Sequence, residues 1–224
     1  MPFRTPVNDI LSVEAAGCIR RQSDLGLKPV VKCNLMEALM GKMIYGLLTS
    51  LDGYIEAPEG VDSRWSGPDE ELHLYFNEMQ RNLALDIYGR RMYEVMRVWD
   101  TYDRDPSIKA FERKFAQLWQ QTPKVVVSTT LQEAGPNARL VGGDVEAAAR
   151  ALKAQTDGDI SVCGAELAAS FGRWGLIDEY QLFVYPSVVG GGKPYFAHGA
   201  PLNLKPLGTE RLPNDVVLLR YAPA

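Results

Sequence analysis

Residues 175–192 read GLIDEYQLFVYPSVVGGG, and this stretch decides much of the fold. Its first residue, Gly175, follows an amphipathic segment and is typical of a helix end. The apolar run that begins at Glu179 indicates a long buried strand, which leads directly into Gly190–Gly192. Because glycines carry no side chains, three in succession suit a place where backbone approaches something flat or anionic. The stretch therefore predicts a helix end, a buried strand and a close backbone approach, in that order.

Short apolar runs alternate with amphipathic segments along the chain from residue 42. The first expected helix opens at Pro68 with acidic residues in its first turn, and its apolar face extends from Leu72 to Leu83. A second helix is expected over 108–120, and Asp144 is expected to cap another. The expected strands are 43–48, 85–88, 124–128, 138–141 and 159–163, followed by a closing hairpin of 204–209 and 216–221. This alternation predicts an α/β fold with a mostly parallel sheet and an antiparallel edge.

The composition limits the class of protein. The chain has 224 residues, of which 46% are hydrophobic, and this suffices for one substantial core. The net charge is −4 and no basic stripe with interleaved aromatic residues occurs, so we expect no nucleic-acid partner. No apolar run is long enough to span a bilayer, so we expect no membrane partner. The odd number of cysteines, without metal-like spacing, argues against a disulfide framework or a metal site and favours a reducing cytoplasm.

The chain divides into two parts by pattern. Residues 1–39 show neither strand nor helix periodicity, and we expect a poorly ordered N-terminal extension there. Their scattered acidic and basic residues argue against a secretory signal. The regular pattern occupies residues 40–224, which we expect to form one domain.

Three strand ends carry residues suited to binding phosphate. In an open α/β sheet, ligands bind at the carboxyl ends of strands, beside the starts of helices. The three sites are Gly89-Arg90-Arg91, Ser128-Thr129-Thr130 and the turn that begins at Gly164; they offer free backbone N–H groups, guanidinium groups and hydroxyls. Each also has a plainer interpretation, as a solvated turn, ordinary turn chemistry or close helix–strand packing. Neither a dinucleotide-binding Gly-x-Gly-x-x-Gly sequence nor a Gly-Lys-Ser/Thr phosphate loop is present.

Five segments in order resemble one family. They are TSLDGYI at 49–55, GRRMYE at 89–94, KVVVST at 124–129, VCGAEL at 162–167 and the stretch quoted first. Together they resemble the dihydrofolate reductase superfamily, in the branch that contains the reductase domain of riboflavin biosynthesis. The chain is similar to a stand-alone member, because residues 1–39 are too short for the deaminase domain of the bifunctional enzyme. The resemblance implies a three-layer α/β/α fold with a mixed sheet of about eight strands, a homodimer, and NADPH as the hydride donor.

The resemblance also assigns residues. Gly89, Arg90 and Arg91, with Ser128 and Thr129, would hold the 2′-phosphate or the pyrophosphate of NADPH. Gly164, Ala165, Glu166 and Leu167 would receive cofactor phosphates at a helix start. Asp52, Gly53 and Trp65 would lie near the nicotinamide and substrate, with Glu179 and Gly190–Gly192 bordering the same cleft. Two departures stand out: Met92 replaces the usual Thr, and Ala165 follows a single glycine where two are common.

Hydride transfer requires placement of the reacting carbons and a proton source. Asp52 is our candidate for orienting the substrate or relaying a proton, and Glu179 is the second acid. The plainer alternatives are that Asp52 only forms an Asp-Gly turn and that Glu179 is the polar start of a buried strand. Trp65 either lines the pocket or anchors its loop. His73 is expected on the polar, solvent-facing side of the first helix.

The sequence therefore predicts an NADPH-dependent reductase of a small pteridine- or aminopyrimidine-like substrate, similar to 5-amino-6-(5-phosphoribosylamino)uracil reductase. An alternative is an NADPH-binding module without turnover, suggested by Met92. A third interpretation is another α/β enzyme that uses a sugar phosphate or a nucleotide.

Overall fold

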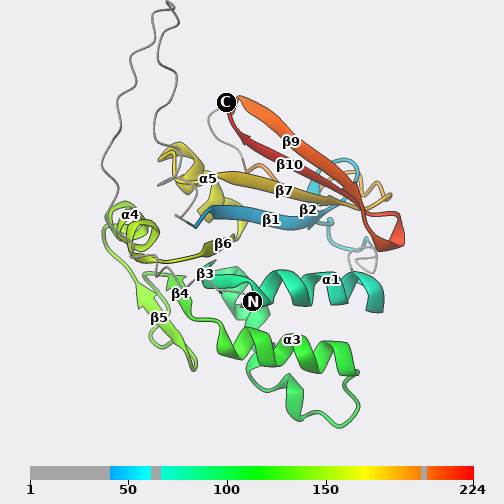
Figure 1. Cartoon of the computed structure of the whole chain (residues 1–224), viewed down its shortest axis with the longest axis horizontal. Helices are drawn as coiled ribbons and strands as arrows, with labels where there is room; N and C mark the ends of the chain where they lie inside the picture. The colour runs from blue at the N-terminus through cyan, green and yellow to red at the C-terminus, as the bar shows by residue number, and fades with distance from the viewer. Residues whose placement is uncertain (1–40, 62–66, 198–200) are drawn as a thin grey trace, which may run out of the picture. The chain divides into compact units, whose positions relative to one another are not determined.

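A sheet of eight strands, in the order β5-β4-β3-β6-β1-β7-β10-β9, organises the protein (Figure 1). The computed structural model describes residues 41–61, 67–197 and 201–224. The strands are β1 (Met43–Thr49), β3 (Leu83–Gly89), β4 (Lys124–Val127), β5 (Ala138–Val141), β6 (Asp159–Cys163), β7 (Glu179–Val184), β9 (Leu204–Arg211) and β10 (Val217–Pro223). The neighbours from β5 to β7 are parallel, whereas β10 pairs antiparallel with both β7 and β9. Two short strands, β2 (Tyr54–Glu56) and β8 (Lys193–Pro194), form a separate antiparallel pair.

Helices cover both faces of this sheet. They are α1 (Glu70–Arg81), α2 (Arg90–Met96), α3 (Ala110–Gln121), α4 (Val145–Gln155) and α5 (Ala165–Arg173). Side chains of α4 and α5 pack with alternate residues of the central strands, such as Tyr45 and Ile87, in one core cluster. On the opposite face, α1 packs against Phe183, and α2 and α3 pack around Tyr88. The predicted three-layer α/β/α fold with an antiparallel C-terminal edge is therefore confirmed. Among the described residues, no helix combines the length and apolar character needed to cross a membrane.

Local rules explain the helix boundaries. Helix α1, expected to open at Pro68, begins at Glu70, because the Asp69 carboxylate accepts a hydrogen bond of 2.9 Å from the backbone N–H of Leu72 and caps the helix. Asp144 caps α4 in the same way, through the N–H of Ala147 at 3.0 Å. Gly175 has a φ of +67°, which allows the chain to leave α5 toward β7.

Three expectations about local structure were wrong. Leu83 belongs to β3, because α1 ends at Arg81. His73 is buried, with its ring 5.0 Å from that of Phe111, because α3 packs over the face of α1 expected to meet solvent. The strand from Glu179 ends at Val184 and does not reach the glycines. Beyond it the chain turns away, and the Val188 side chain is 70% exposed.

Candidate functional site

The three predicted phosphate-binding turns lie side by side at the carboxyl edge of the sheet. Tyr88 pairs with Cys163, and Gly89 pairs with Val127, so the turns after β3, β4 and β6 are neighbours. A side chain on Gly164 would begin 3.9 Å from the Gly89 nitrogen. Gly164 also has a φ of +122°, a conformation that side chains rarely adopt. The parallel topology thus brings three segments that are distant in sequence together at one end of the sheet.

The start of α5 is open to an anion. Gly164 is its N-terminal cap and supplies no side-chain hydrogen bond, so the first N–H groups of the helix remain available. Ala165 and Leu167 are buried and fix this turn against the core. Glu166 is exposed, and its carboxylate is itself favoured at a helix start, where it would compete with a bound anion.

The two arginines differ in their surroundings. Arg90 makes two hydrogen bonds with Glu94, at 2.9 and 3.0 Å, and both side chains are partly exposed. Such a surface pair contributes little stability and can exchange for another anion. Arg91 is exposed and has no ion pair with any described residue. Their guanidinium groups are therefore available for bidentate contacts with phosphate.

Ser128 shapes its own turn. Its Oγ accepts hydrogen bonds from the N–H groups of Thr130, at 3.1 Å, and Leu131, at 2.9 Å. The Ser128 O–H remains able to donate, and Thr129 is exposed beside it. Met92 packs against the third core cluster and offers no hydroxyl beside these turns.

Asp52 lies in contact with the start of the glycine segment. The Asp52 carboxylate accepts hydrogen bonds from the N–H groups of Val189, at 3.1 Å, and Gly190, at 2.8 Å. Hydrogen bonding with the Ser50 hydroxyl, together with these N–H groups, lowers the pKa of Asp52 below its usual range. The carboxylate is therefore ionised at neutral pH, which suits an acceptor or an anchor better than a proton donor.

Glycines at 191 and 192 allow close approach to another segment of the chain itself, whereas the sequence predicted approach to a flat or anionic group. A side chain on Gly192 would begin 2.0 Å from the carbonyl oxygen of Glu56, and one on Gly191 would begin 3.5 Å from Pro58. The backbone thus closely approaches the chain's own β2 region. Gly190, with a φ of +77° and no described atom within 4 Å of a would-be side chain, faces open space.

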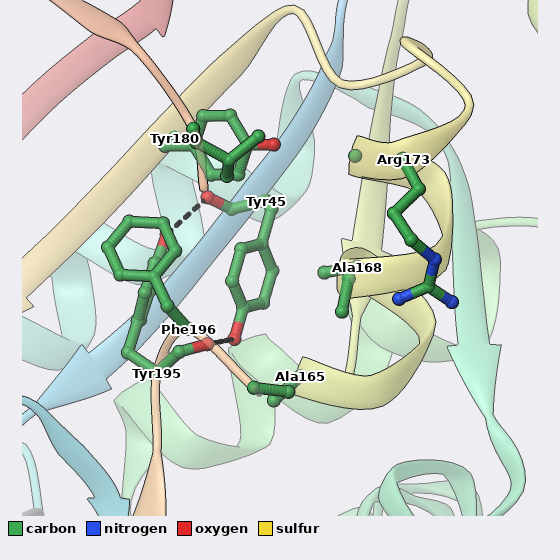
Figure 2. A pocket seen from close by; sticks show the side chains of 11 residues that line it. Tyr45, Ala165, Ala168, Arg173, Tyr180, Tyr195 and Phe196 are labelled. Carbon is green, nitrogen blue, oxygen red and sulfur yellow. Dashed lines mark hydrogen bonds between the residues drawn. The ribbon is translucent and has the colours of Figure 1, made fainter. Parts of the chain in front are cut away.

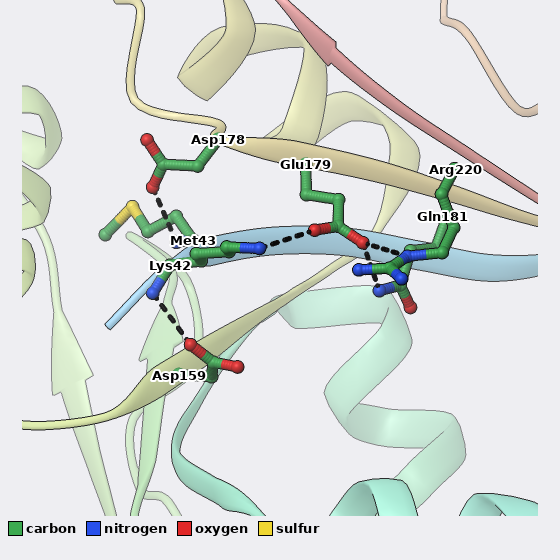
Figure 3. Close-up of polar contacts among 7 residues, drawn as sticks. All are labelled: Lys42, Met43, Asp159, Asp178, Glu179, Gln181 and Arg220. Carbon is green, nitrogen blue, oxygen red and sulfur yellow. Dashed lines mark hydrogen bonds and ion pairs between the residues drawn. The ribbon is translucent and has the colours of Figure 1, made fainter. Parts of the chain in front are cut away.

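The structure places Glu179 away from Asp52 and the glycine segment, with which it was expected to share a cleft. It pairs with Ile44 near the start of β1, whereas Asp52 follows the end of β1. The side chain is 1% exposed and contacts Lys42 Nζ at 3.0 Å, Arg220 Nε at 2.6 Å and Gln181 Nε2 at 2.8 Å (Figure 3). Burial raises the pKa of Glu179, but hydrogen bonds from Arg220, Gln181 and Lys42 outweigh it and lower the value to about 2. Glu179 therefore connects β7 with Lys42, which precedes β1, and with Arg220 of β10, at the end of the sheet where the parallel strands begin.

The remaining predicted site residue, Trp65, lies outside the described residues.

A small cavity of about 60 Å³, which sequence reasoning missed, lies against α5 (Figure 2). The Tyr45 ring stands between α5 and Tyr195, and their hydroxyls donate to each other's carbonyl oxygens at 2.8 and 2.9 Å. The signal was the small residues Ala165, Ala168, Ala169 and Gly172, which follow helical spacing on α5. No group of three or more His, Cys, Asp and Glu side chains in the described ranges could hold a metal ion.

The sheet order and the helices on both of its faces define an α/β protein whose fold is similar to that of dihydrofolate reductase. The family described as the RibD C-terminal domain matches residues 42–218, and the chain belongs to this family. The uncharacterized protein YyaP of Bacillus subtilis strain 168 is 29% identical over 183 residues, which cover 80% of this chain and 94% of the relative.

Two solved structures show the same fold. One is a diaminohydroxyphosphoribosylaminopyrimidine deaminase/5-amino-6-(5-phosphoribosylamino)uracil reductase from Thermotoga maritima, with a TM-score of 0.60 and 16% identity. The match covers 85% of this chain but only 58% of that protein. The other is a dihydrofolate reductase from Enterococcus faecalis complexed with NADP(H), with a TM-score of 0.51, 10% identity, and coverage of 83% and 98%.

Proposed function

We propose that the protein is an NADPH-dependent reductase of a small pteridine- or aminopyrimidine-like heterocycle. The observation that carries this proposal is the convergence of the Gly89, Ser128 and Gly164 turns at one edge of the sheet. Family membership supports reductase chemistry, and the E. faecalis neighbour was solved with NADP(H). The residues fit such a cofactor, because an uncapped helix start and two arginines offer N–H groups and positive charge to phosphates.

In this proposal, Arg90 and Arg91, with Gly89, Ser128 and Thr129, hold the 2′-phosphate or the pyrophosphate. The N–H groups of Ala165, Glu166 and Leu167, exposed by the turn at Gly164, hold the remaining phosphate charge. NADPH, when bound, supplies the hydride.

The substrate would lie on the Asp52 side of the same edge. Gly53, Gly190 and Gly191 would line its position, together with Trp65. Asp52 would orient the substrate as an ionised acceptor or through the loop that it holds. Glu179 is not included, because it lies at the opposite end of β1 from Asp52 and its carboxylate already contacts three partners.

We also propose that the protein works as a homodimer, as the resemblance implies, and in the cytoplasm, which its cysteine pattern favours. The β9–β10 hairpin supports an association surface, because nearly all of β9 is exposed and Leu207 is 46% exposed. The outer edge of β9 is poorly suited to strand addition, since Pro206 lacks an N–H group and the register shifts nearby. A dimer would therefore use the face of the hairpin.

The test compares cofactor binding by wild type and by Arg90→Ala and Arg91→Ala, using thermal shift and calorimetry. We expect NADPH to raise the Tm of wild type more than NADH does, because only NADPH carries the 2′-phosphate. Each substitution should weaken NADPH binding by about tenfold, the loss typical of a charged hydrogen bond. Arg81→Ala is the matched control, because Arg81 makes a similar exposed pair with Glu78 on α1. No binding of either nucleotide at millimolar concentration would overturn the proposal.

A second candidate is an NADPH-binding module without turnover. Met92 favours it, because the hydroxyl of the family's usual Thr is missing beside the phosphate turns. Loss of the near-ultraviolet absorbance of NADPH with any of a panel of pterins, pyrimidines and quinones would exclude this alternative. NADPH binding without such loss across the panel would favour it.

A further inference from the structure

Tyr93 connects two of the predicted phosphate-binding segments from inside the protein. It lies on α2, three residues after Arg90, and its side chain is fully buried. Its ring stacks on that of Trp119 at 6.5 Å. Its hydroxyl accepts a hydrogen bond of 2.7 Å from the backbone N–H of Gly135, in the segment 128–137 that joins β4 to β5.

Segment 128–137 has little regular structure and is fixed at several points. Its first turn is closed by Ser128 Oγ. Leu131 and Ala134 pack on the same core cluster as Tyr93. At its far end, the Asn137 side chain donates to the carbonyl oxygens of Gln120 and Gln121, at 3.2 and 2.9 Å. The hydrogen bond to Tyr93 is thus the polar attachment of this segment to α2.

Gly135 fits this attachment closely. A side chain at this position would begin 2.9 Å from Tyr93 Oη and 2.8 Å from Asp100 Oδ2. The segment therefore sits as near to α2 as its backbone allows. Movement of Gly135 away from Tyr93 would leave a partly buried N–H without a partner, which is costly.

We propose that Tyr93 is a positioning residue for the cofactor: its hydroxyl holds segment 128–137 against α2 and so sets the spacing between the Ser128 turn and Arg90 and Arg91. This inference rests on the proposed function, in which those residues contact the 2′-phosphate or the pyrophosphate of NADPH. Tyr93 itself is buried and touches no cofactor. Two groups that must contact one ligand together gain affinity when their spacing is fixed beforehand.

The test is Tyr93→Phe, which keeps the ring and removes only the hydroxyl. We expect the Kd for NADPH to rise by about five- to tenfold, as for other residues that act on a site indirectly. The maximal rate at saturating NADPH should change less than about twofold, because the reacting carbons are untouched. Amide hydrogen exchange should accelerate at Gly135 and through segment 128–137.

Asn77→Ala is the matched control. Asn77 on α1 is 2% exposed, and its side-chain NH2 group donates to the Phe111 carbonyl at 3.0 Å, in a contact between α1 and α3 outside the predicted binding segments. It should lose a similar amount of thermal stability and keep the wild-type Kd. Gly135→Ala, which crowds Tyr93 Oη, should weaken NADPH binding as Tyr93→Phe does. The two changes together should weaken binding by less than the product of the separate effects.

Two results separate this inference from the proposed function. If NADPH binds wild type in an Arg90- and Arg91-dependent way but Tyr93→Phe leaves its Kd unchanged, the inference is wrong and the proposed function stands. If wild type binds no NADPH, both are overturned. An equal loss of affinity in Asn77→Ala would show a general stability effect and would also overturn the inference.

Discussion

A single carboxylate illustrates how a residue's role depends on what its oxygens contact. Asp52 was predicted from its Asp-Gly context as a group that orients substrate or relays a proton. Its two oxygens instead accept the N–H groups of Val189 and Gly190, from a segment more than 130 positions away in sequence. The pKa of Asp52 is lowered by these contacts and by Ser50. The structure therefore favours an anchoring role, with the catalytic role still a prediction.

Asp52→Ala should release the Val189–Gly190 loop, whereas Asp52→Asn should retain part of the attachment through its one carbonyl oxygen. We expect amide exchange at Val189 and Gly190 to accelerate strongly in the first variant and less in the second. Because the folded pKa is depressed, the attachment is complete above the unfolded pKa of about 3.8 and is lost as pH falls through the lower folded value. Exchange measured by NMR from neutral pH down through and below pH 3.8 checks this window. Unchanged exchange in Asp52→Ala would show that the loop holds itself.

At the scale of elements, Glu179 connects three strands. Its carboxylate lies at the start of β7, between Lys42, which directly precedes β1, and Arg220 on β10. The two cations are about half exposed, while the carboxylate is buried. Solvent therefore screens the two cations. The buried carboxylate has lost its hydration, and the hydrogen bonds and charges of its partners compensate for that loss.

Glu179→Ala should destabilise the protein by about 2–4 kcal/mol, because the partners remain without the charge they surround. The folded pKa is depressed from 4.5 to about 2, so in wild type this stabilisation is present above pH 4.5 and is lost as pH falls toward 2. Urea unfolding at several pH values should show the gap between wild type and Glu179→Ala narrowing over that window. NADPH affinity should stay at the wild-type level, since Glu179 lies at the opposite edge. Weakened NADPH binding with unchanged stability would contradict this structural role and would favour a role for Glu179 in cofactor binding.

Local rules predicted the elements well. Asp144 and Gly175 were predicted to mark helix ends, and they do, because caps depend only on neighbouring residues. The start of α1 was predicted two residues early, at Pro68, and Asp69 is its cap. The meeting of the Gly89, Ser128 and Gly164 turns follows from a parallel sheet, whose carboxyl ends share one edge. The same geometry places Glu179, at the start of a parallel strand, on the other edge.

What sequence could not provide were contacts between distant elements. His73 looked polar and outward on α1, but Phe111 and Phe115 of α3 cover it. Likewise, nothing near Gly192 in sequence indicates that the carbonyl of Glu56 lies where a side chain would begin. These features depend on how two segments pack, which residue periodicity does not encode.

For the whole molecule, charge is divided along the carboxyl edge of the sheet. The β3 and β4 half carries Arg90 and Arg91. The half near β1 and β7 is mainly acidic; of its described basic residues, Lys193 neighbours Glu56 across the β2–β8 pair and Arg211 pairs with Asp215. The acidic residues of this half are Asp52, Glu56, Glu59, Asp69, Glu70 and Glu71. One end of the edge thus attracts phosphate and the other repels it, although the net charge of the chain is only −4.

Raising the salt concentration should therefore weaken the binding of NADPH and relieve the repulsion of a phosphorylated substrate. We expect NADPH binding to weaken as ionic strength rises, because counter-ions screen the exposed guanidinium groups over a Debye length of about 10 Å at 0.1 M. An aminopyrimidine nucleoside should bind more tightly than its 5′-phosphate at low salt, and the difference should shrink as salt screens the repulsion. Calorimetry with each ligand at several salt concentrations measures both trends, and Arg91→Ala should flatten the first without changing the second. Tighter binding of the 5′-phosphate at low salt would contradict this division, because it would require positive charge near Asp52.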